Sequence, residues 1–517
     1  MALQRPLEEL LQEAVQRRIR RAVRRQGAGN SAAGNCRIED LEIVRESIDA
    51  RRKPDVKLVY TVDFSCEEEL PFDPAKRQVY RIPEAGVIGS RPVIAGFGPC
   101  GMFAALLLAE AGLKPIVIER GKPVDERIAD VEKFWNGGTS PDPESNVQFG
   151  EGGAGTFSDG KLTTGIRDIR IRKVLEEFVE AGADPSILYK QRPHIGTDKL
   201  REIIPRIRHK IENLGGEVLF DTRLEGLNIK DGSLQGVCTG GPMGEIKTDW
   251  LILAIGHSAR DTFRMLQDAG MEMEQKPFSI GVRIEHPQDM INRSQYGDPA
   301  LADILGPADY KLSCRTGKSE EDPGRGVYTF CMCPGGRVIN ASTEPGTSVT
   351  NGMSDSNRSS AWANSGLLVD VRTSDFPGDD PLAGIRLQKK YEELAWANRT
   401  ESGMARSTYG QFRRSSQTED GQDPVRNSLP DFASEAILEA MPVFGRKVRG
   451  FDREDARLTA VESRSSSPVR IRRGEDMQAP GFRGVIPAGE GPGYAGGIMS
   501  AACDGIRAAE KIIQSGV

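Results

Sequence analysis

The sequence predicts an α/β protein built on a parallel β-sheet, and three observations support this prediction. An apolar strand at Pro92–Gly96, a helix at Gly101–Ala111 and a second apolar strand at Lys114–Glu119 follow one another closely. Two apolar strands joined by a helix are typical of a parallel sheet. The segment Gly484–Ile513 repeats the order of strand, glycine-rich turn and helix. Glycine is also abundant, at 58 of 517 residues, as expected where turns approach a ligand closely.

Composition excludes several classes of protein. With 69 basic and 75 acidic residues the net charge is −6, which gives no whole-chain reason to expect nucleic acid as the main ligand. The best apolar run, Met102–Ala109, is about half the ~18 residues that a membrane helix needs. We therefore expect no membrane span and a small-molecule substrate.

The cysteines and the N-terminal residues favour a reduced, cytoplasmic setting. Eight scattered cysteines without a CxxC pair predict neither a disulfide scaffold nor a structural zinc site, and we expect no metal. The N-terminal segment lacks the apolar core of a secretory signal. Glu8, Glu9 and Glu13 argue against an organelle transit peptide, although organelle import is kept as the minor alternative.

Residues 1–88 are predicted to form a small α/β appendage. Apolar side chains at three- and four-residue spacing predict an amphipathic helix over 4–25, followed by a linker at Gln26–Gly34. Strands are predicted at Leu41–Ser47 and Lys57–Phe64. The basic side chains of this region are Arg17, Arg18, Arg21, Arg24 and Arg25 on the helix and Arg51, Arg52 and Lys53 between the strands. They form either a solvated face, which we favour, or a surface for RNA or an acidic partner.

The rest of the chain divides into three further predicted parts: residues 89–275, an inserted β-rich α+β part at 276–475, and residues 476–517, which return to the first sheet. Helices are predicted at Arg170–Ala181 and Lys199–Leu214, strands at Glu217–Phe220, Trp250–Ile255 and Gly326–Cys331, and a hairpin at Leu234–Cys238 and Glu245–Thr248. The polar stretches Arg315–Gly326 and Thr400–Ser428 are predicted surface loops.

A GxGxxG run from Gly96 to Gly101, with Pro99 and Cys100 inside it, follows the first strand and opens the helix. In this context the first glycine permits the tight turn and Gly98 lets the backbone approach a pyrophosphate. Gly101 lets the helix pack closely on the strand, and the helix dipole favours the phosphates. Glu119, followed by Arg120, can accept hydrogen bonds from a ribose diol and would repel a 2′-phosphate. The nucleotide is therefore FAD or NAD, and not NADP.

A second glycine-rich turn near the C-terminal end favours FAD over NAD. The turn at Gly489–Ile498 carries Glu490, which can reach the ribityl chain but is one methylene longer than the more usual aspartate. Backbone N–H groups from Gly496 and Gly497 onward are expected to face the flavin pyrimidine ring, where a helix start stabilises negative charge.

Three internal segments are expected to touch the same cofactor. They are the glycine-rich run Gly150–Lys161, the stretch Glu217–Leu224, and Ile255–His257 at the end of a buried strand. The predicted FAD-binding residues are Gly96, Gly98, Pro99, Cys100, Gly101, Glu119, Arg120, Gly152, Gly153, Thr156, Lys161, Leu224, Ile255, Gly256, Gly489, Glu490, Gly496, Gly497 and Ile498.

The sequence resembles the family of uncharacterised FAD-dependent dehydrogenases, flavoproteins of the glutathione-reductase fold with two dinucleotide-binding domains. The resemblance runs from about Ser47 to the end and is carried by SIDARRK, VIAGFGPCG, IVIERG, QFGEGGAGTFSDGKLTT, AIGHSARDTF, IGVRIEHP, YTFCMCPGG, TNGMSDSNR, ESRSSSPVRI and AGEGPGYAGGI. It implies bound FAD, a discontinuous Rossmann-like FAD domain and an inserted substrate domain.

The remaining motifs supply candidate catalytic residues. Cys331 and Cys333 end a strand and are expected to share one face, either as a redox pair or nucleophile beside the flavin or as two buried small residues. His257 is a candidate acid/base or cofactor-positioning residue. Arg283 and Glu285 share a strand face, either as a carboxylate binder with a base or as a surface ion pair. Arg464 and Arg470 are expected either to hold an anionic substrate or to anchor a loop.

Together these features predict an FAD-dependent oxidoreductase that transfers hydride between a small organic, possibly anionic, substrate and the flavin. The chain has one GxGxxG run, so a separate nicotinamide domain is not expected and a second electron carrier would regenerate the flavin. The alternatives are a flavin-holding protein that binds RNA or a partner through the basic N-terminal arm, or a flavin monooxygenase. The substrate, the electron acceptor and the oligomeric state are left open.

Overall fold

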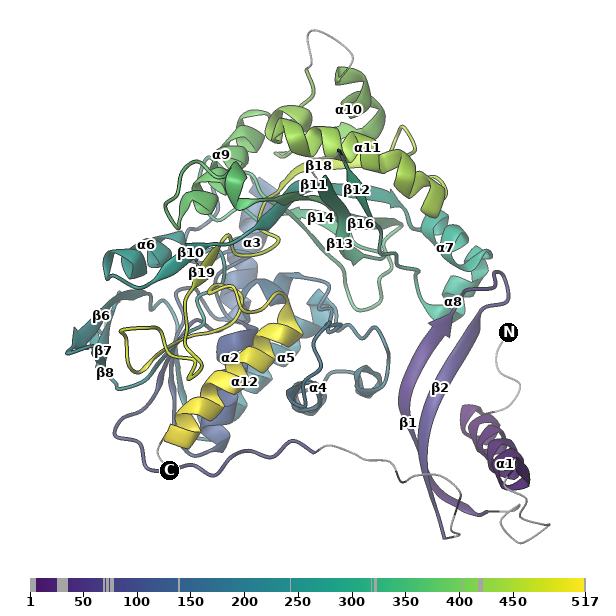
Figure 1. The fold of residues 1–517 in the computed structure, drawn as a ribbon, viewed down its shortest axis with the longest axis horizontal. Helices are drawn as coiled ribbons and strands as arrows, with labels where there is room; N and C mark the ends of the chain where they lie inside the picture. The colour runs from purple at the N-terminus through teal and green to yellow at the C-terminus, as the bar shows by residue number, and fades with distance from the viewer. Residues whose placement is uncertain are drawn as a thin grey trace.

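A five-stranded parallel sheet forms the centre of the structure, a computed structural model (Figure 1). It describes residues 6–25, 36–67, 70, 74, 79–137, 140–241, 243–317, 319, 323–401, 403–416 and 422–515. The strand order is β20-β9-β3-β4-β5, and each adjacent pair is parallel. The strands are β3 (Val93–Ala95), β4 (Ile116–Ile118), β5 (Glu217–Leu219), β9 (Leu251–Leu253) and β20 (Val485–Pro487). Because β20 comes from the end of the chain, it completes a sheet begun some 400 residues earlier.

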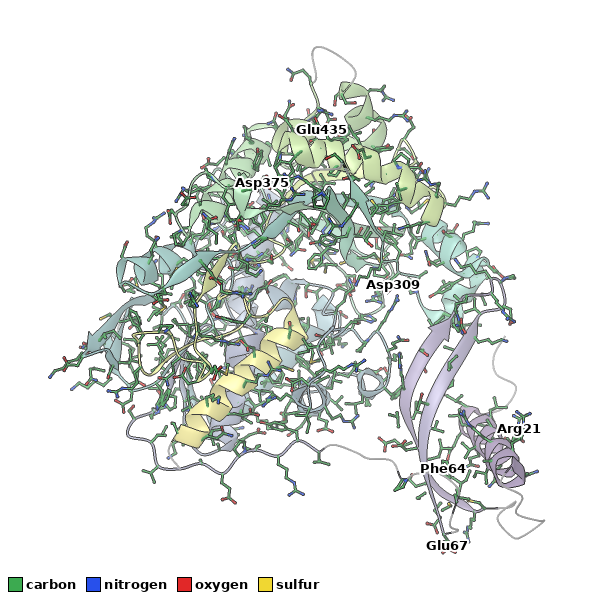
Figure 2. All side chains as sticks on the ribbon, viewed as in Figure 1. Arg21, Phe64, Glu67, Asp309, Asp375 and Glu435 are labelled. Carbon is green, nitrogen blue, oxygen red and sulfur yellow. The ribbon has the colours of Figure 1, made fainter. Side chains whose placement is uncertain are left out.

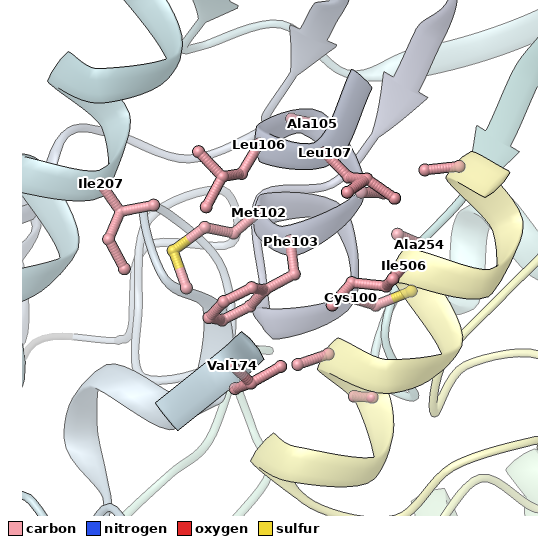
Figure 3. Packing of buried hydrophobic residues seen from close by; sticks show 14 of the residues in the cluster. Cys100, Met102, Phe103, Ala105, Leu106, Leu107, Val174, Ile207, Ala254 and Ile506 are labelled. Carbon is pink, nitrogen blue, oxygen red and sulfur yellow. The ribbon is translucent and has the colours of Figure 1, made fainter. Parts of the chain in front are cut away.

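Helices cover one face of this sheet and a small antiparallel sheet covers the other. The helices are α2 (Pro99–Glu110), α4 (Arg170–Glu180), α5 (Thr197–Asn213) and α12 (Ile498–Ser515). Figure 3 shows Phe103 and Leu107 of α2 packed beside Ile506 of α12. Strand residues alternate between the two apolar cores, so Ile94 faces the helices while Val93 faces the opposite side. Burial on both faces explains why these strands are continuously apolar.

The predicted strand–helix–strand unit is confirmed, but the sequence understated the small sheet on the other face. The predicted hairpin is confirmed as the antiparallel pair β7 (Ser233–Thr239) and β8 (Glu245–Lys247), and a third strand, β6 (Leu224–Lys230), adds to it on the side of β7. The prediction missed β6 because its charged and amide side chains are exposed and only Leu224 is fully buried, so the strand has no clear apolar alternation. Two further helices, α3 (Val124–Gly137) and α6 (Arg260–Asp268), flank the parallel sheet.

A six-stranded antiparallel sheet, in the order β12-β13-β16-β11-β18-β17, forms the second layer of the molecule. Its strands are β11 (Phe278–Pro287), β12 (Ser313–Thr316), β13 (Arg325–Cys333), β16 (Trp362–Val371), β17 (Ala405–Thr408) and β18 (Arg457–Glu462). The helices packed around it are α7 (Gln288–Tyr296), α8 (Ala302–Leu305), α9 (Ala383–Ala397), α10 (Tyr409–Ser415) and α11 (Asp431–Lys447). Figure 1 shows α11 lying across this sheet. Two-stranded sheets pair β10 (Met273–Gln275) with β19 (Val469–Ile471) and β14 (Arg337–Asn340) with β15 (Thr350–Met353).

Both stretches of this part that were predicted to be surface loops contain regular secondary structure. Thr400–Ser428 contains β17 and α10, because Thr408 and Gln411 form a capping box that starts the helix and Phe412 is fully buried. Arg315–Gly326 contains the facing ends of β12 and β13. Residues 318, 320–322, 402 and 417–421 of these stretches lie outside the described part of the chain.

The N-terminal part consists of α1 (Leu7–Arg25) packed on a long hairpin of β1 (Ile38–Asp49) and β2 (Lys57–Cys66), as predicted. Val15 and Ile19 of α1 are buried against the hairpin, where Phe64 packs, while Arg21 is exposed (Figure 2). The predicted linker at 26–34 lies outside the described residues.

The hairpin is hydrogen-bonded to the body at two places. The N–H of Glu46 donates to the carbonyl of Tyr189 at 2.8 Å, and the N–H of Gln191 donates to the carbonyl of Glu46 at 2.9 Å. At the hairpin turn, Lys53 Nζ donates to the carbonyl of Ser294 at 2.6 Å. The hairpin therefore spans from the helical side of the parallel sheet to α7. Among the described residues, no helix has both the length and the apolar composition required to cross a bilayer.

Candidate functional site

A cavity of about 380 Å³ opens at the carboxyl ends of the parallel strands. Ala95, Ile118 and Ala254, which end or follow β3, β4 and β9, all line it. Ligands of open α/β sheets bind at this edge. The cavity continues toward the six-stranded sheet, where Cys331 of β13 and Glu462 of β18 contribute to its wall. It therefore touches both layers of the molecule.

The structure brings most of the predicted cofactor residues to this cavity. Those that line it are Gly96, Gly98, Pro99, Cys100, Glu119, Arg120, Gly153, Lys161, Leu224, Ile255, Gly256, Glu490, Gly496, Gly497 and Ile498. The predicted residues that do not line it are Gly101, Gly152, Thr156 and Gly489, which lie directly behind the wall. Of the catalytic candidates, His257 and Cys331 line the cavity, whereas Cys333, Arg283 and Glu285 do not.

Helix α2 points its N-terminus into the cavity. Its N-cap is Gly98, whose lack of a side chain leaves the first turn without a side-chain cap. A Cβ on Gly101 would lie 1.9 Å from the carbonyl oxygen of Gly96, so that glycine is needed for helix–strand packing, as predicted. A Cβ on Gly98 would meet nothing closer than Gly153 Cα at 3.8 Å, and its φ of −73° suits any residue. The fold itself therefore does not require glycine at position 98.

The start of α12 lies at the same cavity. A Cβ on Gly496 would have no atom within 4 Å, so the chain again leaves bare backbone facing open space. The N–H of Gly496 donates to Ser500 Oγ at 3.1 Å, and Ser500 also lines the cavity. That N–H, one of those expected to face the pyrimidine ring, is therefore already engaged by a side chain of α12. The two helices touch where a Cβ on Gly505 would clash with the carbonyl of Cys100.

The carboxylate of Glu119 is held by three backbone N–H groups. It accepts from Phe97 at 2.8 Å and from both Gly121 and Gly150 at 2.9 Å. These bonds fix its position between the first glycine turn and the glycine-rich run that begins at Gly150. A carboxylate has about four acceptor positions, so capacity remains for one hydroxyl donor.

Arg127, a residue that the sequence analysis missed, holds the glycine-rich run in shape. It is fully buried and donates to the carbonyls of Asn146 at 2.7 Å, Val147 at 2.9 Å and Glu151 at 2.7 Å. Burial lowers the pKa of Arg127 to about 9, although nearby carboxylates oppose the shift. Thr156 is also structural, because its hydroxyl donates to the carbonyl of Glu151 at 2.9 Å.

The end of the cavity beside the six-stranded sheet is rich in ionisable groups. Glu462 is buried and lines the cavity with Arg464, Ser465 and Asn351. Sequence reasoning did not single out Glu462 and Asn351 as site residues. Both residues lie inside segments that carry the family resemblance, ESRSSSPVRI and TNGMSDSNR. That resemblance is the signal by which they could have been found.

The predicted surface ion pair between Arg283 and Glu285 is wrong, whereas the alternative of a carboxylate binder with a base stays a prediction. Arg283 is fully buried, so it makes no surface pair, and its Nη2 donates to Glu462 Oε1 at 2.9 Å. Its other contacts are Asn351 and Asn364 at 3.0 Å and the carbonyl of Cys331 at 2.9 Å. Arg283 and Glu285 lie two residues apart and so share one face of β11. The carboxylate that contacts Arg283, however, comes from the adjacent strand β18.

Burial and neighbouring charges shift the pKa values of two carboxyl groups and one imidazole at the cavity. Burial raises the pKa of Glu462 to about 7 against the opposing effect of Arg283. Burial also raises the pKa of Glu490 to about 7, with Lys276 opposing. Burial, followed by Arg464 and Arg260, lowers the pKa of His257 to about 4, so this imidazole is neutral near pH 7. Two glutamates and not the histidine therefore change charge near neutral pH.

Arg464 is fixed by a buried carboxylate and is not a free cation. Its Nη2 donates to Glu392 Oε2 at 2.8 Å, and Glu392 also accepts from Arg260 at 2.8 Å. The loop-anchoring interpretation of Arg464 thus describes its contacts, although it also lines the cavity. Arg470 does not line the cavity and lies over the ring of Tyr494 at 5.3 Å.

Comparison with known proteins adds family matches. Residues 277–465 match the model "FAD-dependent protein, C-terminal domain-like", and residues 8–65 match a domain of unknown function. A Clostridium beijerinckii protein described as uncharacterized is 44% identical over 504 residues, covering 92% of this chain and 93% of its own length.

Solved structures resemble the chain more weakly. L-proline dehydrogenase from P. horikoshii is 13% identical, covers 84% of this chain and 94% of its own, and has a TM-score of 0.35. Glycine oxidase from Bacillus cereus is 11% identical, covers 83% of this chain and 95% of its own, and has a TM-score of 0.33. Scores this low do not establish a shared overall fold and assign no reaction to this chain.

Proposed function

Since the chain belongs to the same family as the Clostridium beijerinckii protein and uses FAD, as its match to the FAD-dependent C-terminal domain indicates, we propose that it transfers hydride between a small organic substrate and that cofactor. The observation that carries this proposal is the meeting of two helix N-termini, from α2 near one end of the chain and α12 at the other, around one cavity.

We extend the proposal to the domain organisation. Residues 89–275 and 476–517 together form a discontinuous FAD-binding domain of the glutathione-reductase type, with β20 and α12 supplied by the second segment. Residues 276–475 form the inserted substrate domain, and residues 1–88 form the appendage. The supporting observation is that the two large sheets have separate apolar cores.

The residues present fit FAD. Gly98 and Gly496 face the cavity with room for a side chain that the sequence does not supply. Bare backbone that the fold does not itself require is what a closely approaching ligand requires. Two helix dipoles directed into one space favour a diphosphate. The ionisable groups on the far wall would then lie beside the flavin.

Each part of the wall has a role toward the cofactor. The N-terminus of α2 holds the pyrophosphate, and the acceptor capacity left on Glu119 takes one ribose hydroxyl. Glu490 and the start of α12 hold the ribityl and pyrimidine portions. When bound, FAD supplies the site that accepts or donates hydride.

The substrate lies against the six-stranded sheet, where Glu462 and Ser465 line the cavity. Glu462 holds or releases a proton near neutral pH, which suits a residue that takes a proton from a substrate as hydride leaves. His257 is held as the neutral imidazole with its Nδ1 within hydrogen-bond distance, 2.9 Å, of Ser258 Oγ.

The test is purification followed by an absorbance scan and an anaerobic screen of metabolites for bleaching of the flavin spectrum. We expect a yellow protein whose visible absorbance falls with one class of substrate. A folded protein that is colourless and cannot be reconstituted with FAD contradicts the proposal.

A matched pair of variants tests the site itself. Gly98→Val places a side chain where the diphosphate is proposed to lie, and we expect the dissociation constant of FAD to rise at least ~100-fold, equivalent to about 2.7 kcal/mol. Gly137→Val, at the exposed end of α3 where a Cβ has no atom within 4 Å, should bind FAD as the wild type does. Equal affinities in the two variants would contradict the assignment of the diphosphate to α2.

A further inference from the structure

The wall of the cavity next to the six-stranded sheet carries two cysteines and two cations that the proposed hydride transfer does not use. We propose that Cys331 and Cys333 form a redox-active dithiol that exchanges two electrons with the bound FAD through a reversible disulfide. This inference rests on the proposed function, because FAD is its electron partner. It assigns to these cysteines a chemical step that the family match does not.

The backbone of β13 brings the two cysteines together. The register against β16 shifts between Phe330 and Cys333, so the strand is irregular at this point. Cys331 has a φ of +41°, a left-handed conformation that is uncommon for a residue other than glycine. As a result Cys333 Sγ lies 3.3 Å from the carbonyl oxygen of Cys331 and donates to it. Strained backbone of this kind is concentrated at functional sites.

Two cations border the pair from different elements. Arg283 of β11 donates from Nη1 to the carbonyl of Cys331 at 2.9 Å. Lys161 Nζ lies 4.0 Å from Cys333 Sγ and donates to the carbonyl of Met332. The pKa of Cys331 is well below the ordinary thiol value, because the adjacent Cys333 thiol, Lys161 and Arg283 all favour its thiolate. A thiolate is the reactive form of cysteine.

Access to the cavity separates the roles of the two sulfurs. Cys331 is half-buried and lines the cavity, whereas Cys333 is fully buried behind it. Cys331 is therefore the sulfur that meets the cofactor, and Cys333 is the sulfur that closes the bond. The neighbouring Cys331 sulfur, and then burial, raise the pKa of Cys333, so it keeps its proton until the bond forms.

The step balances without another reactant. Formation of one sulfur–sulfur bond from the Cys331 thiolate and the Cys333 thiol releases two electrons and one proton, which together reduce oxidised FAD to FADH⁻. In the opposite direction the disulfide takes up two electrons and one proton, and the thiolate and the thiol are restored. The cations near the pair stabilise the thiolate and leave the direction to the relative potentials of the dithiol and the cofactor.

The sequence makes the disulfide easy to detect. Trypsin cleaves after Arg325 and after Arg337, and the fragment between them contains Cys331 and Cys333 and no other cysteine. The FAD-loaded protein is poised anaerobically in buffers of oxidised and reduced dithiothreitol, quenched with N-ethylmaleimide and digested. We expect this peptide to lose both labels together as the buffer becomes oxidising, in parallel with a change in the visible absorbance of the flavin.

The controls identify which bond has formed. Cys331→Ser and Cys333→Ser should each leave the remaining cysteine fully labelled and uncouple the flavin absorbance from the thiol titration. Cys238→Ser, which removes an exposed cysteine far along the sequence, should titrate as the wild type does.

Three outcomes would overturn the inference. Complete labelling of the peptide across the whole titration, with FAD bound, means that no disulfide forms. Flavin absorbance that responds to the buffer identically in the wild type and in Cys331→Ser means that the pair does not exchange electrons with the cofactor. In both cases the proposed function stands. A protein that takes up no FAD overturns the inference and the proposed function together.

Discussion

The two sheets meet at one cavity but contribute to it in opposite ways. The parallel sheet and its helices present mainly backbone and small side chains, as at Gly98 and Gly496. The side of the six-stranded sheet presents ionisable side chains that are buried and paired, such as Glu462 of β18, held by Arg283 behind the wall, and Arg464 after β18, held by Glu392 of α9. The wall from the parallel sheet is suited to holding a ligand by shape and by backbone donors. The wall from the six-stranded sheet is suited to exchanging protons with that ligand.

Because of this difference, variants of one wall test how the ligand is bound, whereas variants of the other wall test charge and proton transfer. A wall of backbone N–H groups carries no titratable side chain, and a side chain added there takes ligand space, as at Gly98, or clashes with the fold, as at Gly101, so its variants should change affinity or folding. A wall of buried ion pairs depends on the balance between desolvation and attraction, so its variants should change stability and pH dependence. The predictions below set variants of one wall against variants of the other.

The largest effect is expected at the buried ion pair. Arg283→Met leaves Glu462 without its partner, and we expect the free energy of unfolding to fall by about 3–5 kcal/mol in urea denaturation. The double variant Arg283→Met/Glu462→Leu should recover much of this loss, because both charges are then absent. A loss below about 1 kcal/mol in the single variant would show that the pair is not desolvated as described.

A smaller loss of stability is expected from the backbone wall. Gly101→Ala places a Cβ 1.9 Å from the carbonyl of Gly96, and α2 must then move away from β3. We expect the free energy of unfolding to fall by about 1–3 kcal/mol, with weaker FAD binding as a consequence. Gly98→Val should show the reverse ranking, with FAD binding lost and stability nearly unchanged. Unfolding measured with and without FAD separates the two behaviours.

The next prediction concerns pH. The pKa of Glu490 is raised by burial to about 7, so the folded protein binds more protons than the unfolded chain between about pH 4.5 and pH 7. Stability contributed by the protonated form is therefore lost as the pH rises through this window. Glu490→Gln should become more stable relative to the wild type by about 1–3 kcal/mol between pH 5 and pH 8.

The control for this comparison is Glu285→Gln, a carboxyl whose pKa is also raised by burial but which does not line the cavity. Added FAD should change the pH dependence of the wild type and of Glu285→Gln, and it should not restore that dependence in Glu490→Gln. Parallel stability curves for the wild type and Glu490→Gln would contradict the raised pKa of Glu490.

The smallest effect is expected far from both walls. Arg18 and Arg21 are exposed on α1, and replacing both with glutamine should change the free energy of unfolding by less than about 0.5 kcal/mol. The flavin spectrum should not change. If the basic arm binds a polyanion, salt-dependent association measured with a homopolymer RNA should weaken in this variant. Equal binding by both proteins would remove the basis for the RNA-binding alternative.

Much of the parallel-sheet wall could be predicted from the sequence because its signals are local. The run from Gly96 to Gly101 encodes a strand, a turn and a helix within a few residues, and Glu490 follows a strand in the same way. The opposite wall depends on pairing between strands far apart in the chain. Arg283 and Glu462 meet only because β11 and β18 are neighbours, and no spacing in the sequence reveals that.

The two cysteines show the same limit on a smaller scale. Simple alternation along a strand predicted that Cys331 and Cys333 share a face, yet the strand is irregular there and a left-handed residue sets their approach. The sequence likewise gave no signal for Arg127, whose bonds to three carbonyls shape the glycine-rich run. A buried arginine in a helix looks the same in sequence as an exposed one.

The contact between α2 and α12 sets the order in which this molecule can mature during translation. The carbonyl of Cys100 packs against Gly505. The early βαβ unit can therefore complete its packing only after α12 has been synthesised. Until then the apolar face of α2 lacks a partner and is open to chaperones or to aggregation. Closing so long a loop also slows folding. With FAD bound between α2 and α12 as proposed, a nascent chain would offer only half of the binding surface, and we expect cofactor loading to follow synthesis of α12.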